Sequence, residues 1–527
     1  MPATILALSS VVGMYAAFMV VGALAARRAR EGDASALLVA GRKMPLWIAV
    51  MTMTATWIDG GYLLGTAEYT YSYGIAIGLQ GGICFGISLI LGGLFFAATM
   101  RRHAFTTLID PFDRRFGKKW AAVLLLPAVL GELFWSGALL VAIGSTFGVL
   151  LDMDLATAIL LSAAVVTVYT MMGGMWSVAY TDAFQLLLIP LGLFAALPYV
   201  LDHVGGLAGC WDAFLRYRGD ATIVPLEISA HWSAPALVSW WDMAIMLVFG
   251  GIPWNCYFQR VLSCETPESA SQHSILAGCL TILLTIPPMI LGMAALAWWG
   301  PTGISDPAQT LPMLLKFLTP PLVMVLGLAA IIGAVTSSFS SSILSAGSMF
   351  SWNVYCRLFE PDAPVDRTRR MIRISIVLLG AAAAWLALQV QSVAQLWLFT
   401  GDLVFVLLFP QLVMALYDPK VNRSGSIVAF AVSLVLRLGG GVEIFGLPAF
   451  IPYPELFESL LPGTPAEWYN NKGATLFPVK TLAGVAGLVL LPVVSRLTAR
   501  FDPPRELGEP QQESATERAE QEASEDE

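Results

Sequence analysis

The sequence predicts an all-α integral membrane protein with about 13 transmembrane helices. Hydrophobic residues make up 57% of the 527 residues and charged residues make up 13%, whereas about 25% of the residues in an ordinary soluble domain are charged. Apolar stretches of about 18 residues or more recur along the chain, and each is long enough to cross a bilayer as a helix. These two observations exclude a water-soluble globular protein and favour one polytopic bundle.

The apolar stretches define the expected spans in chain order. Residues 1–30 hold the first span, and residues 425–500 hold two C-terminal spans. The expected spans lie near residues 4–26, 46–68, 75–100, 119–150, 157–174, 178–200, 237–258, 273–299, 320–350, 371–391, 395–417, 425–445 and 478–497.

The distribution of Lys and Arg predicts the orientation of the bundle. Basic clusters occur within residues 27–43, 101–119, 357–373 and 420–423. All of them fall on one side of the membrane if the N-terminus is outside. Because cytoplasmic loops carry an excess of Lys and Arg, this side is predicted to be the cytosolic one.

The formal net charge of −8 resides in the C-terminal segment. Residues 501–527 contain ten Asp or Glu and two Arg, and residues 517–527 contain no aromatic residue. Such a composition cannot bury enough apolar surface to order itself, so residues 501–527 are predicted to form an acidic, disordered cytosolic tail. A segment that binds trafficking adaptors is the functional alternative. No basic block indicates binding to nucleic acid, and no catalytic, metal or cofactor motif indicates an enzyme.

Two of the expected spans contain residues that break helices. Residues 57–61 (WIDGG) lie inside the second span, and residues 250–254 (GGIPW) lie inside the seventh. Gly weakens a helix, and Pro lacks the amide donor that a helix needs. Unwound backbone at this depth is tolerated only where protein buries it or where it lines a watery cavity. We therefore predict that both spans unwind in the middle of the membrane.

The two breaks are five spans apart, which predicts a 5+5 inverted-repeat core. Residues 46–200 form the first five-helix repeat and residues 237–417 form the second, and the odd number of spans inverts one relative to the other. In such cores, half-helix ends and freed carbonyls surround a midplane site for solute and sodium. The alternative is that the glycines only allow close helix packing.

Tryptophans accompany both breaks. Trp57 and Trp254 lie beside them, and Trp135 lies within another span. Indole rings that converge on one cavity attract a quaternary ammonium, at about 2 kcal/mol or more for each desolvated contact. The rings indicate an organic cation as solute, although aromatic residues also fill membrane cores.

Hydroxyl and carboxyl groups in the spans suggest a cation site. The cluster Ser337, Ser338, Ser340, Ser341 and Ser342 follows Thr336 in the ninth span. Hard cations prefer oxygen ligands, although one Ser alone usually bonds within the membrane to a helix carbonyl or to a neighbouring helix. Asp59 and Asp182 are intramembrane carboxylates, which are costly unless they are paired, hydrated or bound to a cation.

Short motifs that run in order along the chain carry a family resemblance. The sequence resembles the choline-transporting branch of the sodium/solute symporter family, which also includes the sodium–glucose cotransporters, over residues 10–495. The motifs are residues 52–57 (TMTATW), 60–62 (GGY), 65–68 (GTAE), 88–96 (SLILGGLFF), 110–112 (DPF), 131–135 (GELFW), 177–182 (SVAYTD), 250–254 (GGIPW), 257–263 (YFQRVLS), 342–345 (SILS) and 409–411 (FPQ).

The resemblance implies a function and a set of site residues. It implies sodium-coupled, chloride-dependent uptake of choline across the plasma membrane by alternating access, presynaptic in cholinergic neurons, where it supplies acetylcholine synthesis. The implied choline cage is Trp57, Trp135 and Trp254, with Phe85 where that branch carries a tyrosine. The implied sodium ligands are the carbonyls of Ala55, Ile58 and Ala334 and the hydroxyls of Ser337 and Ser338. A second sodium site, which some relatives have, maps near Thr56, Asp182, Ser340 and Ser341.

Departures from the family pattern leave the solute and the coupling open. That branch carries Asp where this chain has Ser340 and Gly where it has Asp59, so we hypothesise that Asp59 is a compensating carboxylate. One rival interpretation is a sodium symporter for another organic cation, a sugar, an amino acid or a carboxylate. The other is a sensor that does not transport, or a channel. A homo-oligomer is compatible with every interpretation.

Overall fold

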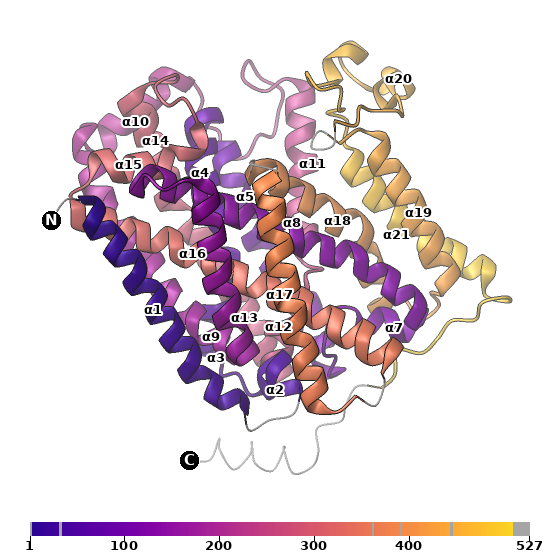
Figure 1. The fold of residues 1–527 in the computed structure, drawn as a ribbon. Coiled ribbons are helices and arrows are strands. Elements are labelled where there is room, and N and C mark those ends of the chain that lie inside the picture. The colour runs from indigo at the N-terminus through magenta and orange to yellow at the C-terminus, as the bar shows by residue number, and fades with distance from the viewer. Residues whose placement is uncertain (1–2, 31–33, 361–362, 390–392, 443–445, 510–527) are drawn as a thin grey trace, which may run out of the picture.

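The computed structural model describes residues 3–30, 34–360, 363–389, 393–442 and 446–509. The part of the expected tail from residue 510 onward lies outside the described residues. Within the described residues the chain is a bundle of helices (Figure 1). The long helices are α1 (Ala3–Arg30), α8 (Lys118–Leu151), α9 (Leu155–His203), α16 (Pro321–Met349), α17 (Val365–Gln389), α18 (Val393–Tyr417), α19 (Arg423–Gly439) and α21 (Val479–Thr498).

Other expected spans are each built from two helices in succession. These pairs are α3 (Leu46–Trp57) with α4 (Gly60–Tyr73), α11 (Ala234–Gly250) with α12 (Asn255–Ser263), and α13 (Pro267–Leu284) with α14 (Ile286–Trp299). Helix α5 (Ile75–Leu91) continues through a π-helical turn, Gly92–Ala97, into α6 (Ala98–Arg102). Shorter helices are α2 (Ala34–Val39), α7 (Asp110–Phe116), α10 (Gly206–Arg218), α15 (Thr310–Leu318) and α20 (Tyr453–Leu456).

Ten helices of the described chain are long and apolar enough to cross a membrane. Helix α9 covers two expected spans, because its 49 residues would reach about 74 Å as a straight helix, far more than the bilayer core of about 30 Å. It bends instead at Gly174, whose φ of 55° and ψ of −138° are not helical. The broken span formed by α3 and α4 adds one span to these, and the single helix α19 adds another. About 13 spans are therefore compatible with the structure.

Helix α16 lies at the centre of the bundle. In its most apolar window, 83% of the residues are buried, and its contacts with α9 and α8 are among the most extensive in the molecule. The hydroxyls of a helix that is buried on all sides need hydrogen-bond acceptors within the protein, either in the helix itself or in its neighbours. The serines of α16 therefore face other helices and not lipid.

Two of the basic segments lie toward the same end of the bundle. Helices α2 and α7, which lie within the basic segments 27–43 and 101–119, are at the lower end in Figure 1, and α10, α15 and α20 are at the upper end. The clustering agrees with the expected sidedness of Lys and Arg. Which end faces the cytosol, and the boundaries assigned to the two repeats, remain predictions.

The start of the expected tail, residues 501–509, contacts the bundle. Arg115 Nη1 donates to the Arg505 carbonyl at 2.7 Å, and Arg114 Nη1 donates to the Leu507 carbonyl at 3.0 Å. The Leu507 side chain is buried in the main hydrophobic core. Composition did not reveal this segment because backbone carbonyls, which every sequence offers, make its polar contacts.

Candidate functional site

Both predicted helix breaks are present, at the predicted residues. Helix α3 ends at Trp57, and α4 begins at Gly60, with Ile58 (φ −90°, ψ 74°) and Asp59 (φ −90°, ψ −178°) in non-helical conformations between them. Residues 251–254 likewise separate α11 from α12. The breaks follow from Gly and Pro, which weaken the helical hydrogen-bond ladder at these points.

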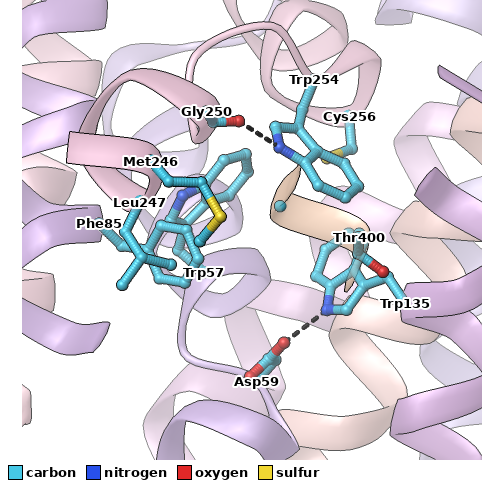
Figure 2. Close-up of a pocket in the computed structure, with 11 residues that line it drawn as sticks. Trp57, Asp59, Phe85, Trp135, Met246, Leu247, Gly250, Trp254, Cys256 and Thr400 are labelled. Carbon is cyan, nitrogen blue, oxygen red and sulfur yellow. Dashed lines mark hydrogen bonds between the residues drawn. The ribbon is translucent and has the colours of Figure 1, made fainter. Parts of the chain in front are cut away.

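The two breaks meet at one buried pocket (Figure 2). Trp135 and Trp254 contact each other edge to face, with ring centroids 5.4 Å apart and an interplanar angle of 72°. The Trp254 indole N–H donates to the Gly250 carbonyl at 2.8 Å, across the second break. The lining residues are Trp57, Asp59, Phe85, Trp135, Met246, Leu247, Gly250, Trp254, Cys256, Thr400 and Gly401. All four side chains of the expected cage therefore line one cavity.

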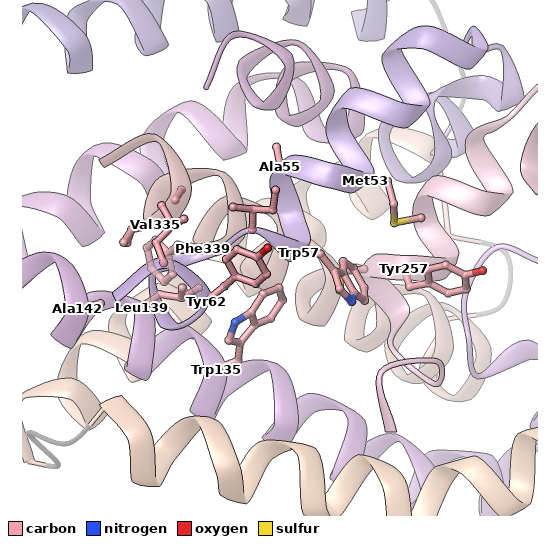
Figure 3. Packing of buried hydrophobic residues seen from close by; sticks show 14 of the residues in the cluster. Met53, Ala55, Trp57, Tyr62, Trp135, Leu139, Ala142, Tyr257, Val335 and Phe339 are labelled. Carbon is pink, nitrogen blue, oxygen red and sulfur yellow. The ribbon is translucent and has the colours of Figure 1, made fainter. Parts of the chain in front are cut away.

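Trp57 is held in the pocket by packing on its other side. Its ring lies against Tyr257 of α12, with centroids 6.0 Å apart at 68°, as Figure 3 shows. The Tyr257 hydroxyl is hydrogen-bonded to Ser274 at 2.9 Å. Because Tyr257 is fixed from α13, the Trp57 ring has a rigid backing and presents its free surface to the cavity.

Sequence reasoning missed several residues of the pocket. Met246 and Leu247 lie on α11 one turn before the break at Gly250, so the spacing of helical residues could have indicated them. Thr400 and Gly401 come from α18, which is distant in sequence from both breaks. No local signal marks them, because only the packing of α18 against the core brings them to the cavity.

The oxygens expected to hold sodium come together between α16 and α3. Ser337 Oγ donates to the carbonyls of Ala55 at 2.8 Å and of Ala334 at 3.0 Å. Ser338 Oγ donates to the Thr56 carbonyl at 2.8 Å. These carbonyl and hydroxyl oxygens are the kind of ligand that a hard cation prefers.

Ile58, the remaining expected ligand, lies at the helix break beside this group. It follows the last residue of α3, and its own amide closes that helix by donating to the Thr54 carbonyl at 3.0 Å. Its backbone is non-helical, so its carbonyl does not continue the α3 ladder. The oxygen set of Ala55, Ala334 and Ser337 fits a bound cation, and Ile58 lies at the adjoining break.

The region expected to hold a second sodium contains a guanidinium. Arg260 Nη2 donates to Asp182 Oδ2 at 2.8 Å and to Ser341 Oγ at 2.5 Å, and both partners of this ion pair are fully buried. Thr52 Oγ1 donates to the same carboxylate oxygen at 2.5 Å, and Thr56 Oγ1 lies 3.2 Å from Ser341 Oγ. Arg260 therefore supplies a positive charge to Asp182 Oδ2 in this region, while Asp182 Oδ1 has no hydrogen-bond partner among the described residues. Arg260 lies just beyond the span expected near residues 237–258, so only the tertiary structure revealed its pairing with Asp182.

Asp59 and Ser340 make different hydrogen bonds in the structure. Ser340 Oγ donates to the Ser337 carbonyl at 2.9 Å within α16. Asp59 lines the aromatic pocket and bonds to Tyr62 and Trp135. The hypothesis that Asp59 is a compensating carboxylate needs these two positions to share one cation region, and it stays a prediction.

Comparison with known protein families identifies the family of this chain. Residues 37–433 match the sodium:solute symporter family. The chain belongs to this family. As a member of the sodium:solute symporter family with ten or more apolar helices, it is a multi-pass membrane protein.

Named relatives of this family member are transporters. The "High-affinity choline transporter 1" of Drosophila melanogaster is 39% identical over 500 residues, which cover 92% of this chain and 77% of the relative. The "High affinity choline transporter 1" of Homo sapiens is 36% identical over 502 residues, covering 92% of this chain and 83% of that one. More distantly, the "Sodium/glucose cotransporter" of Vibrio parahaemolyticus is 23% identical over 429 residues, covering 76% of this chain and 78% of that one.

A solved structure supports the symporter fold. The outward-open structure of a Na+-coupled sialic acid symporter superposes with a TM-score of 0.73, covering 95% of this chain and 99% of that one. The two sequences are 17% identical, so the likeness concerns the fold. It supports the predicted 5+5 core with two broken helices.

Proposed function

We propose that the protein takes up choline across the plasma membrane, coupled to sodium, by alternating access. The observation that carries this proposal is the pocket at the two helix breaks, where three indole rings and one carboxylate surround a single cavity. A quaternary ammonium offers no hydrogen-bond donor and is attracted to π faces. The choline transporters among the relatives point to the same solute.

Sodium supplies the driving force in this proposal. The oxygens of Ala55, Ala334 and Ser337 bridge α16 and the broken span, so a cation between them stabilises the arrangement that forms the pocket. A ligand can drive a conformational change only through its different affinities for the two states. Sodium and choline therefore each tighten the binding of the other.

The finer parts of the proposal rest on the family resemblance. They are dependence on chloride, a presynaptic location and a supply of choline for acetylcholine synthesis. Trafficking adaptors bind at the tail in this proposal, and a homo-oligomer is compatible with it.

The decisive experiment is uptake of radiolabelled choline by cells or proteoliposomes that contain the protein. We expect accumulation with an inward sodium gradient, and loss of accumulation when lithium or potassium replaces sodium. A bis-quaternary ammonium compound should compete with choline. Accumulation that persists without sodium would contradict coupling, uptake of a sugar or amino acid that choline does not inhibit would assign another solute, and a large current without solute would indicate a channel.

A further inference from the structure

Asp59 is the one charged side chain among the described residues that line the aromatic pocket. Its side chain is buried, with an exposed fraction of 4%. It lies at the first helix break, as the N-cap of the 14-residue helix α4. Figure 2 shows its carboxylate directed toward Trp135 below the cavity.

The carboxylate is held in place by two hydrogen bonds. Oδ1 accepts from the Tyr62 amide at 2.5 Å, and Oδ2 accepts from the Trp135 indole N–H at 2.5 Å. The positive end of the α4 dipole favours an anion at this N-cap. The position is therefore built for a negative charge, and the same charge orients one ring of the cage.

Asp182, another buried acid of the core, has a cationic partner that Asp59 lacks, because it pairs with Arg260. Glu132 resembles Asp59, since it accepts hydrogen bonds from the neutral donors Ser342 and Ser345, but it does not line the pocket. No Lys, Arg or His of the described chain forms an ion pair with Asp59, whose side-chain bonds go to an amide and an indole. A buried carboxylate without a cation is unfavourable in a membrane interior. A cationic solute in the pocket would supply the missing positive charge.

We propose that Asp59 is the counter-charge for a quaternary ammonium solute in this pocket. This inference rests on the proposed function and adds to it a criterion by which the pocket selects its solute. The rings attract a cation through their faces, while Asp59 rejects isosteres that lack the positive charge and ligands that carry a carboxylate of their own. Two charges interact more strongly in the dry interior than in water, so the discrimination is large.

The test is the competition of three ligands of similar shape for choline uptake. They are choline, its neutral carbon isostere 3,3-dimethylbutan-1-ol, and the zwitterion glycine betaine. The quantity to compare is the inhibition constant of the neutral isostere divided by that of choline. We expect this ratio to fall about tenfold or more in Asp59→Asn, because choline loses one favourable charge contact and the neutral isostere does not. Betaine should gain relative to choline in the same variant.

Several variants separate the charge from the fold. Asn and Ser also cap helices, so Asp59→Asn and Asp59→Ser should both preserve the N-terminus of α4. If one variant does not fold, the other can be measured in its place. Asp154→Asn is the matched control, because Asp154 caps α9 by accepting from the Thr157 amide at 3.0 Å on the exposed surface.

Two results would overturn the inference. If choline and the neutral isostere weaken by the same factor in Asp59→Asn, the carboxylate only positions Trp135. If the sodium concentration for half-maximal uptake shifts while the ratio stays constant, Asp59 serves the ion and not the solute. Both results presuppose choline uptake by the unchanged protein, whereas absence of that uptake would count against the proposed function itself.

Discussion

Ser337 connects the centre of the bundle to the broken span through one hydroxyl group. That hydroxyl donates to the carbonyls of Ala55 on α3 and Ala334 on α16. In the proposed sodium site, the same oxygen turns toward the cation. One residue therefore contributes both to the packing of two helices and to the binding of the ion.

We predict that Ser337→Ala raises the sodium concentration needed for half-maximal choline uptake by about tenfold, since one ligand oxygen is lost. Sodium titrations of initial uptake rates measure this value. Ser433→Ala is the control, because Ser433 is also buried and donates to the Ala483 carbonyl at 2.8 Å, away from the site. Each variant loses a hydrogen bond worth about 1 kcal/mol, so an equal sodium shift in both would argue against the assignment.

At the scale of the element, the start of α4 depends on a residue without a side chain. A Cβ at Gly60 would lie 2.6 Å from Val335 Cγ2 of α16 and 3.1 Å from Ala142 Cβ of α8. Figure 3 shows Val335 and Ala142 in this part of the core. Gly60 therefore serves the helix break and also allows three helices to approach closely.

We predict that Gly60→Ala lowers both the melting temperature and the choline uptake, because neighbouring helices must move apart and disturb the pocket beside Asp59. Overpacking of this kind destabilises by about 1–3 kcal/mol. Fluorescence-detected melting of the solubilised protein, together with uptake, measures both effects.

Gly65→Ala provides the control within the same helix. A Cβ at Gly65 meets no atom within 4 Å, and Ala favours a helix over Gly by up to about 1 kcal/mol. This variant should melt at the same temperature or higher. If both variants behave alike, helix propensity and not packing explains the effect of Gly60.

At the scale of the whole molecule, the chain beyond α21 ties several helices together. Asn422 Nδ2 donates to the Asp502 carbonyl at 2.6 Å, and Arg115 Nη1 donates to the Arg505 carbonyl at 2.7 Å. Arg115 Nε also donates to the Ala415 carbonyl near the end of α18, at 2.8 Å. Residues 501–509 thus contact the ends of α7 and α19, and Arg115 of α7 links them to the end of α18.

We predict that truncation after Arg500 destabilises the protein, because it removes the partners of Arg115 and Asn422 and the buried Leu507 side chain. The melting temperature should fall by about 1 °C for each kcal/mol lost in a chain of this length. Truncation after Glu509 keeps these contacts and removes only the acidic remainder, so its melting temperature should match the full chain. Equal melting temperatures for both truncations would show that the segment does not stabilise the bundle.

The sequence by itself predicted the order of the spans, both helix breaks and the three tryptophans that line the pocket. Hydropathy and the presence of Gly and Pro act locally, so they are readable without knowledge of the packing. The family resemblance further indicated Ala55, Ala334 and Ser337, whose oxygens the structure brings together.

Only the tertiary structure decided which side chains face one another. It placed Asp59 among the indoles and Ser340 within α16, set Arg260 against Asp182, and brought Thr400 of α18 to the pocket. Each of these outcomes depends on contacts between helices that are far apart in the chain. No local pattern encodes such contacts, because the rotation and depth of each helix are set by the packing of all its neighbours.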